Sequence, residues 1–448
     1  MSTDLKPSGS NFTTLLNRIQ TNEAIIGVIG LGYVGLPLAV GFAERGYTVF
    51  GVELDEKKIE NINKGINYIG DVDSERLKEL VALKRLSATG DFASLKKADV
   101  IVICVPTPLN KTGDPDVSYI VAARDSIRNS LRPGQLITLE STTYPGTVDE
   151  VILPYFAETG LVAGEDYFLA FSPERIDPSN ATYQVDNTPK VVGGVTPACT
   201  EVACAFYAKL VGKVIPVSST RAAEMVKILE NTFRAINIGL ANEIAIICRK
   251  LGLDVWEVID AAASKPFGFM PFYPGPGLGG HCIPIDPSYL AWKLREQKYH
   301  TRFIDLATQV NSSMPEHVIE LVVETLNDES KPVRNARILI LGVAYKRDID
   351  DLRESPALDI IQLLRNRGAL VEYHDPHVPR IEAAGEIKVP LVSVPLDEKL
   401  LQKQDLVIVI TDHSSFDYHF ICRYSKLVLD TRNATKGIKD SAARVVKL

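Results

Sequence analysis

A single cysteine, Cys282, follows a glycine-rich stretch of the chain and is placed as a reactive thiol would be. The segment PGPGLGGHCIPIDP, residues 274–287, puts this cysteine behind a backbone that can bend freely and four residues ahead of Asp286. A thiolate is a strong nucleophile that can add to a carbonyl carbon and hold the product covalently. The adjacent His281 is a weaker candidate for activating the thiol, because neighbouring residues in a chain usually point apart.

The other five cysteines are scattered along the chain without any C-x-x-C pair. Such thiols in an intracellular protein are usually reduced and buried rather than paired in disulfides. Cys104 in VIVICVPTP and Cys248 in IAIICRKLG fit that description. We therefore expect Cys282 to be the cysteine with a chemical role.

Polar side chains elsewhere could complete a site around such a thiol. Lys227 and Asn231 stand four residues apart in a predicted helix, so they share one face and could stabilise a developing oxyanion. Glu174 in FSPERIDP and Thr142 in LESTTYPGT each follow a predicted strand, where a carboxylate or hydroxyl can hold or deprotonate water. The alternative interpretation is that these are ordinary residues of a helix surface and of exposed loops.

A glycine motif near the N-terminus predicts a dinucleotide site. The segment AIIGVIGLGYVGLPLAV has the G-x-G-x-x-G spacing between an apolar strand and a helix, at Gly30, Gly32 and Gly35. Such glycines permit a tight turn, let backbone approach a pyrophosphate, and allow close packing of helix on strand. Glu53 ends the next strand, where a carboxylate binds the adenosine ribose. Because it also repels a 2′-phosphate, we expect NAD rather than NADP, although Lys58 and its basic neighbour work against that preference.

The two sites together predict an oxidation. NAD accepts hydride, and a cysteine beside it can add to an aldehyde and carry it through a thiohemiacetal to a thioester, which water then cleaves to an acid. A primary alcohol would thereby be oxidised twice without release of the aldehyde. Thr107, in the loop CVPTPLNK at the same predicted edge of the sheet, is expected to contact the cofactor, unless this loop is only a proline-shaped turn.

The elements expected to position these residues form two sheets and a helical middle. Apolar strands alternate with helices from about 24 to 215, which is typical of a parallel, doubly wound sheet. One helix is predicted from Thr220 to Leu251, and because it is apolar on several faces it should be buried between domains or subunits. The predicted fold is therefore α/β, with two Rossmann-like doubly wound parallel sheets flanking a central helical domain. The expected parts are an N-terminal extension at 1–22, an NAD-binding domain at 23–217, a central helical and dimerisation domain at 218–330, and a C-terminal sheet domain at 331–448.

From about residue 24 to the C-terminus, these motifs resemble the nucleotide-sugar 6-dehydrogenases, the UDP-glucose/GDP-mannose dehydrogenase family. The resemblance implies NAD-dependent oxidation of the C6 hydroxymethyl of a UDP-sugar to a carboxylate, with the sugar nucleotide bound by the C-terminal domain. The catalytic residues that it implies are the nucleophile Cys282, the water-positioning Asp286 and Glu174, the water-holding Thr142, and the oxyanion-stabilising Lys227 and Asn231.

Further residues are expected to bind the two ligands. Those at the cofactor are Gly30, Gly32, Tyr33, Val34, Gly35, Glu53, Lys58, Thr107, Thr142 and Arg353. Those at the substrate are Glu174, Arg175, Lys227, Asn231, Tyr273, Gly279, Lys346 and Arg432.

Within the family, several motifs are closest to bacterial UDP-N-acetylglucosamine 6-dehydrogenases of surface-polysaccharide (O-antigen) biosynthesis. They are STTYPGT, SPERIDP, KPFGFMPFYPGPGLGGHCIPIDP and DDLRESP. The chain departs from the glucose branch at Ile285, where that branch has a lysine, and at Pro178, where it has a second acid. We therefore expect UDP-N-acetylglucosamine as substrate, with UDP-glucose, UDP-N-acetylmannosamine and UDP-N-acetylgalactosamine as alternatives.

Composition and charge limit the partners. With 49 Lys and Arg against 56 Asp and Glu, the formal net charge is -7, which argues against nucleic acid. Apolar runs are too short to span a bilayer and the N-terminus lacks a signal pattern, so we expect a cytoplasmic protein that forms a homodimer or larger homo-oligomer around the long helix. The segment YHDPHVP offers His374, Asp375 and His377 but no fourth ligand, so no metal site is predicted.

Two other functions share part of the pattern. A two-electron β-hydroxy-acid dehydrogenase would use a dinucleotide sheet and a Lys and Asn on the long helix, but it would need neither Cys282 nor the C-terminal domain. A catalytically silent NAD-responsive sensor would keep the glycine motif and lose the reactive residues, whereas this sequence has all of them.

Overall fold

The computed structural model describes residues 9–70, 72–110, 113–175, 185–280, 282–383, 390–439 and 441–448. Pro178 and His281 therefore lie outside the described residues. The chain divides into two compact units. The first is Met1–Glu230 with Ser288–Lys298, and the second is Asn231–Pro287 with Tyr299–Leu448.

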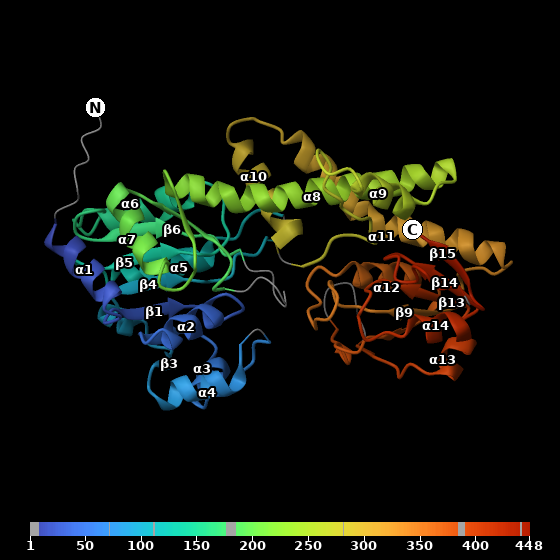
Figure 1. The fold of residues 1–448 in the computed structure, drawn as a ribbon, viewed down its shortest axis with the longest axis horizontal. Helices are drawn as coiled ribbons and strands as arrows, with labels where there is room; N and C mark the ends of the chain where they lie inside the picture. The colour runs from blue at the N-terminus through green and yellow to red at the C-terminus, as the bar shows by residue number, and fades with distance from the viewer. Residues whose placement is uncertain are drawn as a thin grey trace. The chain divides into compact units, whose positions relative to one another are not determined.

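The first unit is built on an eight-stranded sheet with the order β3-β2-β1-β4-β5-β6-β7-β8 (Figure 1). Its strands are β1 (Ile25–Ile29), β2 (Thr48–Val52), β3 (Leu86–Thr89), β4 (Val100–Ile103), β5 (Leu136–Leu139), β6 (Phe168–Phe171), β7 (Lys190–Gly194) and β8 (Val214–Val217). All neighbouring strands are parallel except β6 and β7, which are antiparallel. The strand order reverses direction between β1 and β4, and ligands bind at such a reversal in open α/β sheets.

Helices cover both faces of this sheet. They are α1 (Ser10–Gln20), α2 (Gly35–Glu44), α3 (Glu56–Asn63), α4 (Ser74–Ala82), the 3-10 helix η1 (Phe92–Lys97), α5 (Ser118–Arg128), the π-helical turn η2 (Val148–Ile152), α6 (Leu153–Ala157) and α7 (Pro197–Tyr207). Val100 and Val102 of β4 pack in one core cluster, whereas Ile101 and Ile103 pack in another. Both faces are therefore buried, which explains why the central strands are continuously apolar.

The helix α1 lies in the segment predicted as an N-terminal extension. Its Phe12, Leu15 and Ile19 are buried in the same core cluster as the sheet. The helix is therefore part of the packed first unit rather than a free tail.

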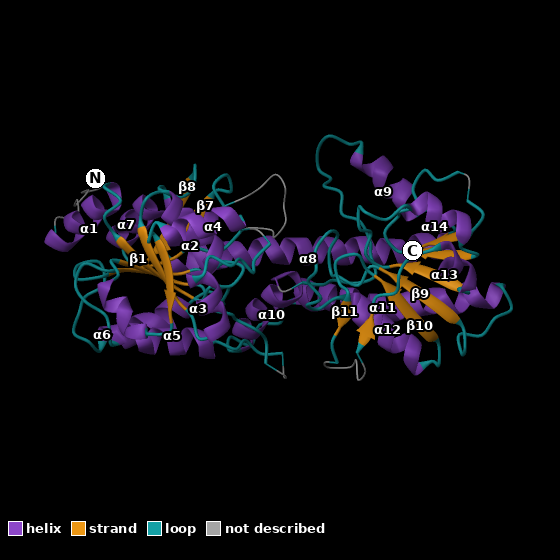
Figure 2. Cartoon of the chain, turned by 90° about the horizontal axis from the view of Figure 1, so that it is seen from below, coloured by secondary structure: helices purple, strands orange, loops and turns teal. Residues whose placement is uncertain are grey.

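The second unit contains a five-stranded parallel sheet with the order β10-β9-β13-β14-β15 (Figure 2, strands in orange). Its strands are β9 (Arg337–Leu341), β10 (Leu370–His374), β13 (Leu406–Val409), β14 (Leu427–Asp430) and β15 (Arg444–Lys447), with a separate antiparallel pair of β11 (Arg380–Ile381) and β12 (Leu391–Val392). The helices beside it are α11 (Arg302–Asp328), α12 (Pro356–Asn366), α13 (Glu398–Lys403) and α14 (Tyr418–Tyr424). Alternate residues of β9 pack in two clusters, so this sheet is also covered on both faces.

Three further helices make up the middle of the chain: α8 (Thr220–Leu251), α9 (Val255–Ala263) and α10 (Cys282–Arg295). The predicted bounds of the long helix are confirmed. It ends before Gly252, whose φ of 69° is the left-handed conformation that terminates helices. The predicted α/β class with two doubly wound sheets and a helical middle is confirmed as well, with the single antiparallel pair β6–β7 as a feature that the sequence did not predict.

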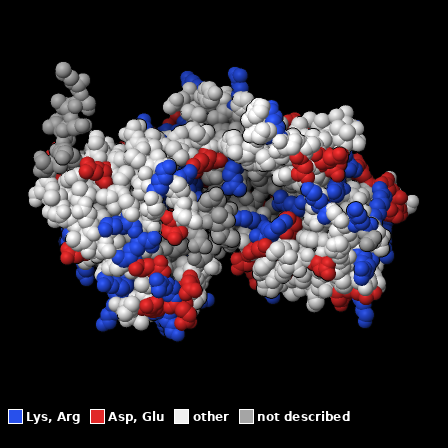
Figure 3. Space-filling model, viewed as in Figure 1, with Lys and Arg blue, Asp and Glu red and all other residues white. Residues whose placement is uncertain are grey.

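Charge is distributed rather than concentrated on the face shown in Figure 3, where basic and acidic side chains are interspersed over both units. Among the described residues, no helix combines the length and apolarity needed to cross a membrane.

Candidate active site

In the glycine loop between β1 and α2, protein packing leaves no room for a side chain at two of the three glycines, whereas it leaves room at the third. Gly30 has a φ of 87°, and a Cβ there would lie 2.6 Å from the carbonyl oxygen of Cys104. A Cβ on Gly35 would lie 1.9 Å from the carbonyl oxygen of Gly30. Around Gly32, by contrast, a Cβ would meet no atom within 4 Å. The space beside Gly32 is therefore left for something other than protein, as the pyrophosphate of a dinucleotide requires.

The beginning of α2 supports the same interpretation. Its N-cap residue, Val34, makes no side-chain hydrogen bond to the first turn, so no side chain caps the positive end of the helix dipole. The predicted cofactor residues Tyr33 and Val34 both lie at this helix start, where Tyr33 is exposed and Val34 is half-buried. An uncapped helix N-terminus is suited to bind phosphate.

Glu53, at the end of β2, reaches the glycine loop. Its Oε2 accepts a hydrogen bond from the backbone N–H of Leu31 at 3.0 Å, and its Oε1 accepts one from the N–H of Leu54 at 2.8 Å. The Nζ of Lys58 lies 3.8 Å from Oε2. The structure thus brings together the glycines, the acid and the lysine predicted for the cofactor, and these groups fit the phosphates and ribose of NAD.

Several predicted residues follow β4, β5 and β6 at their carboxyl ends, which meet at one edge of the sheet. Thr107 is buried, and its carbonyl oxygen accepts a hydrogen bond from the hydroxyl of Tyr289 at 2.8 Å. Thr142 is half-buried in the loop after β5, and Glu174 is buried in the loop after β6. Parallel strands therefore place these three side chains along the edge where ligands bind in this kind of sheet.

An ionic cluster that the sequence did not predict surrounds Glu174. The Nζ of Lys190 lies 2.7 Å from Oε2 of Glu140 and 3.6 Å from Oε2 of Glu174. The hydroxyl of Tyr207 donates to Oε1 of Glu140 at 2.6 Å. Burial raises the pKa of Glu140. For Lys190 burial acts to lower the pKa, but the negative charges of Glu140 and Glu174 outweigh this effect and raise it. Two signals in the sequence could have indicated this cluster. Glu140 directly follows the buried strand β5, and Lys190 begins the strand KVVGG.

Two predicted residues tie the loop of Glu174 to its surroundings. Lys227, on α8, donates from Nζ to the backbone carbonyl of Glu174 at 2.6 Å. Arg175 pairs with Glu230 at 2.5 Å and donates to the carbonyl of Pro189 at 2.7 Å. The side chain of Arg175, predicted to bind substrate, therefore holds the protein's own acid and backbone here.

In the second unit, the predicted nucleophile and two of its expected neighbours belong to one arrangement. Cys282 is the first residue of α10 and is half-buried, and Asp286 is fully buried one turn further along the same helix. The Nδ2 of Asn231 donates to Oδ2 of Asp286 at 2.5 Å. A cysteine at a helix N-terminus is exposed to the positive end of the helix dipole, which stabilises the thiolate.

The glycine loop before Cys282 packs against the domain predicted to bind the substrate. A Cβ on Gly279 would lie 2.6 Å from Cβ of Tyr345, and a Cβ on Gly280 would lie 2.7 Å from the ring of Tyr345. The N–H of Gly280 donates to the carbonyl of Arg353 at 2.9 Å. These two glycines let the loop approach Tyr345. Gly279 stays a predicted substrate residue, and it lies beside the segment of Lys346, which is half-buried and also predicted to bind substrate.

Arg432 lies against the same loop, where a Cβ on Gly275 would come within 2.6 Å of its guanidinium. Its Nε donates to the carbonyl of Ile410 at 2.9 Å. Burial, with the nearby charge of Arg347, lowers the pKa of Arg432 to about 10. The charge of Asp430 acts in the opposite direction, towards a higher pKa. Arg432 thus places a cation beside the loop that precedes Cys282.

The last two predicted ligand residues lie on the surface of the second unit. Arg353 is exposed and forms a two-pronged pair with Asp351, with Nη2 to Oδ2 at 2.6 Å. Tyr273 is exposed, stacks on Trp256 and donates to Asp260 at 2.9 Å. Arg353 belongs to the second unit and the glycine motif to the first, and the cofactor contact of Arg353 stays a prediction.

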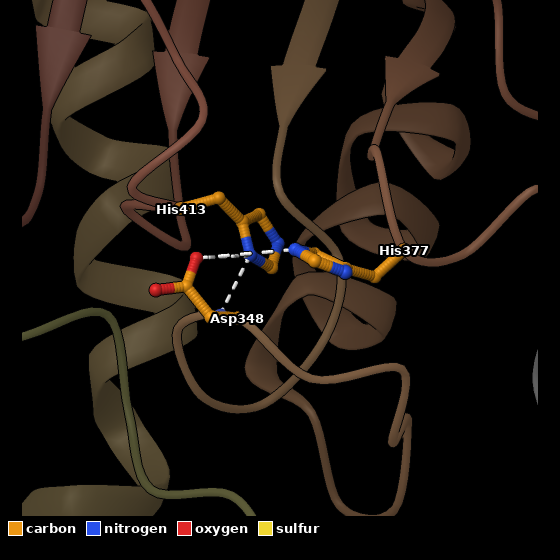
Figure 4. Close-up of side chains that lie close together, drawn as sticks. All are labelled: Asp348, His377 and His413. Carbon is orange, nitrogen blue, oxygen red and sulfur yellow. Dashed lines mark hydrogen bonds and ion pairs between the residues drawn. The ribbon is translucent and has the colours of Figure 1, made fainter. Parts of the chain in front are cut away.

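Asp348, His377 and His413 converge in the second unit, with possible ligand atoms within 4.8 Å of one another (Figure 4). The N–H of Asp348 donates to Nδ1 of His413 at 2.9 Å, so the ring proton lies on Nε2, which faces Asp375 at 3.0 Å. Both ring nitrogens of the buried His413 thus hold protein groups, and metal binding would cost one of these bonds. Of the other two residues named in the sequence with His377, Asp375 is therefore a partner of His413, whereas His374 is engaged elsewhere, with its Nδ1 facing the carbonyl of Val394 at 2.7 Å.

The chain matches models of one family in three successive segments. They are the NAD binding domain of the UDP-glucose/GDP-mannose dehydrogenase family at residues 24–211, its central domain at 221–313, and its UDP binding domain at 339–437.

Individual relatives agree with these matches. The chain is 36% identical over 393 residues to UDP-N-acetyl-D-glucosamine 6-dehydrogenase of Pseudomonas aeruginosa, which covers 87% of this chain and 91% of the relative. It is 35% identical over 417 residues to UDP-N-acetyl-D-mannosamine dehydrogenase of Pyrococcus horikoshii, covering 92% and 96%.

Solved structures extend the comparison. A UDP-D-ManNAc dehydrogenase structure from Pyrococcus horikoshii is similar with a TM-score of 0.85 and 34% identity, covering 94% of this chain and 98% of that one. A UDP-glucose dehydrogenase structure from Pyrobaculum islandicum is similar with a TM-score of 0.83 and 27% identity, covering 95% and 97%. With the glycine loop, Glu53 and the two sheets in place, the chain belongs to the UDP-glucose/GDP-mannose dehydrogenase family and is an NAD-dependent nucleotide-sugar dehydrogenase.

Proposed function

We propose that this protein oxidises the C6 hydroxymethyl of UDP-N-acetylglucosamine to a carboxylate, giving UDP-N-acetylglucosaminuronic acid, through a covalent intermediate on Cys282. The observation that carries the proposal is the arrangement around that thiol: Cys282 begins α10, and the buried carboxylate of Asp286, one turn on, is held by the amide of Asn231. A simple alcohol dehydrogenase needs neither the thiol nor this carboxylate.

The proposed reaction removes two hydrides from one carbon and adds one water oxygen. NAD, when bound at the glycine loop, accepts hydride in each oxidation. Cys282 adds as thiolate to the carbonyl carbon of the aldehyde, forming a C–S bond. After the second oxidation this bond is a thioester, and attack by water breaks it, releasing the carboxylate and returning the thiolate.

The remaining residues have roles that follow from their chemistry. Lys227 and Asn231 offer a cation and an amide donor to oxygen atoms that gain negative charge during addition and hydrolysis. Glu174 and Thr142 hold the attacking water, with Glu174 accepting its proton. Asp286, acting through its bond to Asn231, orients that amide and influences the thiol one turn away.

The identity of the nucleotide part rests on the second sheet domain. That domain matches the UDP binding domain of the family, and Lys346, Arg353 and Arg432 lie in it. The position of the Arg432 guanidinium beside the loop that precedes Cys282 supports a role in binding the pyrophosphate, because a guanidinium binds phosphate oxygens through paired hydrogen bonds.

The choice of an N-acetylhexosamine rests on the relatives and on the loop of Cys282. Relatives at 36% and 35% identity are named for UDP-N-acetyl-D-glucosamine and UDP-N-acetyl-D-mannosamine. Position 285, in the first turns of α10, holds a buried isoleucine instead of the lysine expected of the glucose branch. The motifs around Glu174 and Cys282 favour the glucosamine configuration. The proposal places the product in the cytoplasmic supply of precursors for a surface polysaccharide such as O-antigen.

The test measures NADH yield and substrate preference. A limiting amount of UDP-N-acetylglucosamine should give two NADH per sugar without free aldehyde, and one NADH per sugar would contradict the covalent mechanism. Catalytic efficiency should be compared for UDP-glucose and for the gluco, galacto and manno forms of the N-acetyl sugar. A tenfold or larger preference for UDP-glucose would refute the substrate and leave the enzyme class intact.

A matched pair of cysteine variants tests the nucleophile. Cys282→Ala should abolish acid formation while NAD binding persists. Cys204→Ala, which removes another half-buried thiol on α7, should leave turnover unchanged. Normal turnover by Cys282→Ala would exclude this residue as nucleophile.

The proposal includes a homodimer. Phe233, Leu240, Ile247 and Leu251 are exposed, and their spacing of seven, seven and four residues places them along one side of α8. A second copy of the same stripe would bury them. Leu240→Lys should therefore lower the mass measured by light scattering, whereas Leu83→Lys, at an isolated exposed leucine, should not. Equal masses for both variants would contradict this interface.

A further inference from the structure

Three ionisable side chains meet inside the first unit, and only one of them was expected to take part in chemistry. Glu140, Lys190 and Glu174 are all buried. Nζ of Lys190 lies 2.7 Å from Glu140 and 3.6 Å from Glu174. Tyr207 completes the shell of Glu140 by donating at 2.6 Å. Buried charges are costly unless they are paired, so a cluster of this kind requires an explanation.

The antiparallel strand pair explains how the lysine comes to this place. Because β7 runs opposite to β6, with Phe171 beside Gly193, the first residue of β7 lies at the carboxyl end of β6. Lys190 is that first residue. A parallel β7 would have put its first residue at the other edge of the sheet. The reversal therefore delivers a cation to the edge where Glu140 and Glu174 follow their strands.

The carboxylate of Glu174 is fixed at both oxygens. Oε1 accepts from the N–H of Arg175 at 2.8 Å, and Oε2 faces Lys190. Its backbone carbonyl accepts from Lys227. Lys190 in turn donates from Nζ to Oε2 of Glu140, and the hydroxyl of Tyr207 donates to the other oxygen of Glu140. The lysine is thus not free to follow Glu174, and it presents a fixed charge to one of its oxygens.

We infer that Lys190, held by Glu140, is a positioning residue for Glu174: it orients this carboxylate and keeps a positive charge beside it, so that Glu174 can accept a proton from the attacking water. The inference rests on the role given to Glu174 in the proposed function. Glu140 acts in the opposite direction on the charge of Glu174, because it competes for the same cation and adds a second negative charge.

Other titratable groups also face this carboxylate. Among the described residues they are Lys190 on β7, Glu140 after β5, Cys104 after β4, Lys227 on α8 and the adjacent Arg175. Burial and the charge of Glu140 raise the pKa of the Cys104 thiol, so that thiol stays neutral. Arg175 is neutralised by Glu230. Lys227 already belongs to the proposed catalytic set, so its removal would not isolate a positioning effect. Lys190 and Glu140 are therefore the groups whose removal should change the charge beside Glu174 in opposite senses.

The experiment measures the pH dependence of kcat with UDP-N-acetylglucosamine in three variants. Lys190→Met removes the cation, so the acidic limb of the profile should move up by about one pH unit, the smaller end of the effect of an adjacent opposite charge. Glu140→Gln removes the competing anion, so the limb should move down. Lys190→Arg keeps the cation and should restore a profile close to that of the unaltered enzyme. The KM values for sugar and NAD should stay within about threefold, because a residue that acts only through Glu174 should affect turnover rather than ligand binding.

A second background separates positioning from folding. In Glu174→Gln, adding Lys190→Met should change kcat by less than about twofold, since a residue that acts through Glu174 has nothing left to act on. An equal loss from Lys190→Met in both backgrounds, or limb shifts of the same sign in Lys190→Met and Glu140→Gln, would overturn the inference. If Lys190→Met does not fold, Lys190→Met/Glu140→Gln removes the pair together, and it should still shift the limb upward.

The same set distinguishes this inference from the proposed role of Glu174. If Glu174→Gln alone keeps the kcat and pH profile of the unaltered enzyme, the role of Glu174 is wrong and the inference falls with it. If Glu174→Gln lowers kcat and Lys190→Met lowers it further by its full factor, only the positioning role of Lys190 is overturned.

Discussion

Substitution of Gly32 by alanine tests whether the space above the glycine loop belongs to a dinucleotide. A Cβ at this position meets no protein atom within 4 Å, and the φ of Gly32 is not in the left-handed region. The folded protein should therefore accept the methyl group, and the smaller freedom of the unfolded chain should stabilise it by about 0.4 to 1 kcal/mol. The same methyl occupies the approach of the pyrophosphate. Its crowding should cost NAD binding about 1 to 3 kcal/mol, or about 5- to 150-fold in Kd.

Gly35→Ala is the matched control, since it adds the same methyl three residues away. There the Cβ would lie 1.9 Å from the carbonyl oxygen of Gly30 and 3.2 Å from the side chain of Cys104. The helix α2 would have to move away from β1. The expected cost to folding is about 1 to 3 kcal/mol, which for a domain of this size lowers the midpoint of thermal unfolding by about 2 to 12 °C.

Two measurements on each variant are sufficient. Calorimetric titration gives the Kd for NAD, and thermal unfolding without ligand gives stability. The reasoning requires opposite patterns: weaker binding with unchanged or higher stability for Gly32→Ala, and lower stability for Gly35→Ala. An unchanged Kd in Gly32→Ala would show that nothing approaches this backbone. A loss of stability as large as that of Gly35→Ala would show that protein fills the space.

Three further substitutions address the ligand residues and the second unit. Glu53→Ala should weaken NAD binding by about 1 to 3 kcal/mol, the scale of hydrogen bonds to a charged acceptor, and an unchanged calorimetric Kd would place Glu53 outside the cofactor site. Lys346→Ala should raise the KM for the UDP-sugar far more than the KM for NAD; equal changes would argue against a role in substrate binding. Burial raises the pKa of Asp375, but hydrogen bonds from His413 and backbone N–H groups outweigh burial and lower it to about 2, against an ordinary 3.8. Asp375→Asn should therefore cost about 2 kcal/mol of stability at neutral pH, as measured by denaturant unfolding. This loss of stability should shrink as pH falls from about 4 towards 2, because the carboxylate of the unaltered protein becomes protonated. A loss that is constant with pH would refute this link between the ionisation of Asp375 and folding.

The parts of the fold that the sequence predicts well are those whose signals are local. The long helix was predicted from Thr220 to Leu251 because a hydroxyl residue precedes a continuous helical pattern and Gly252 ends it. The central strands were predicted because their residues are apolar throughout, and they are apolar because both faces of the sheet are buried. The glycine motif was predictable for a similar reason, since turn, phosphate approach and packing all act within six residues.

The parts that the sequence missed depend on partners far along the chain. The strand β7 begins with a lysine and ends with two glycines, a composition that disfavours strands, and its pairing with β6 and β8 stabilises it. Gly279 and Gly280 approach Tyr345, which no local pattern connects to them. Arg175 pairs with Glu230, which is also distant in the chain, and the substrate roles of Gly279 and Arg175 stay predictions.

Lys227 and Asn231 show how a correct spacing can leave the working state of a site undefined. The sequence predicted that these residues share one face of α8 and offer a cation and an amide to an oxyanion. In the structure each donates to a protein oxygen instead: Lys227 to the carbonyl of Glu174, and Asn231 to the carboxylate of Asp286. Each of these groups carries more than one N–H, because an ammonium has three and an amide nitrogen has two. Each can therefore keep the contact seen here and offer a further N–H to an oxyanion. Only an interaction that is stronger in the transition state than with the bound substrate lowers the barrier. Under the proposed mechanism Lys227 offers a full positive charge whereas Asn231 offers a neutral amide, so we expect Lys227 to contribute the larger share of oxyanion stabilisation.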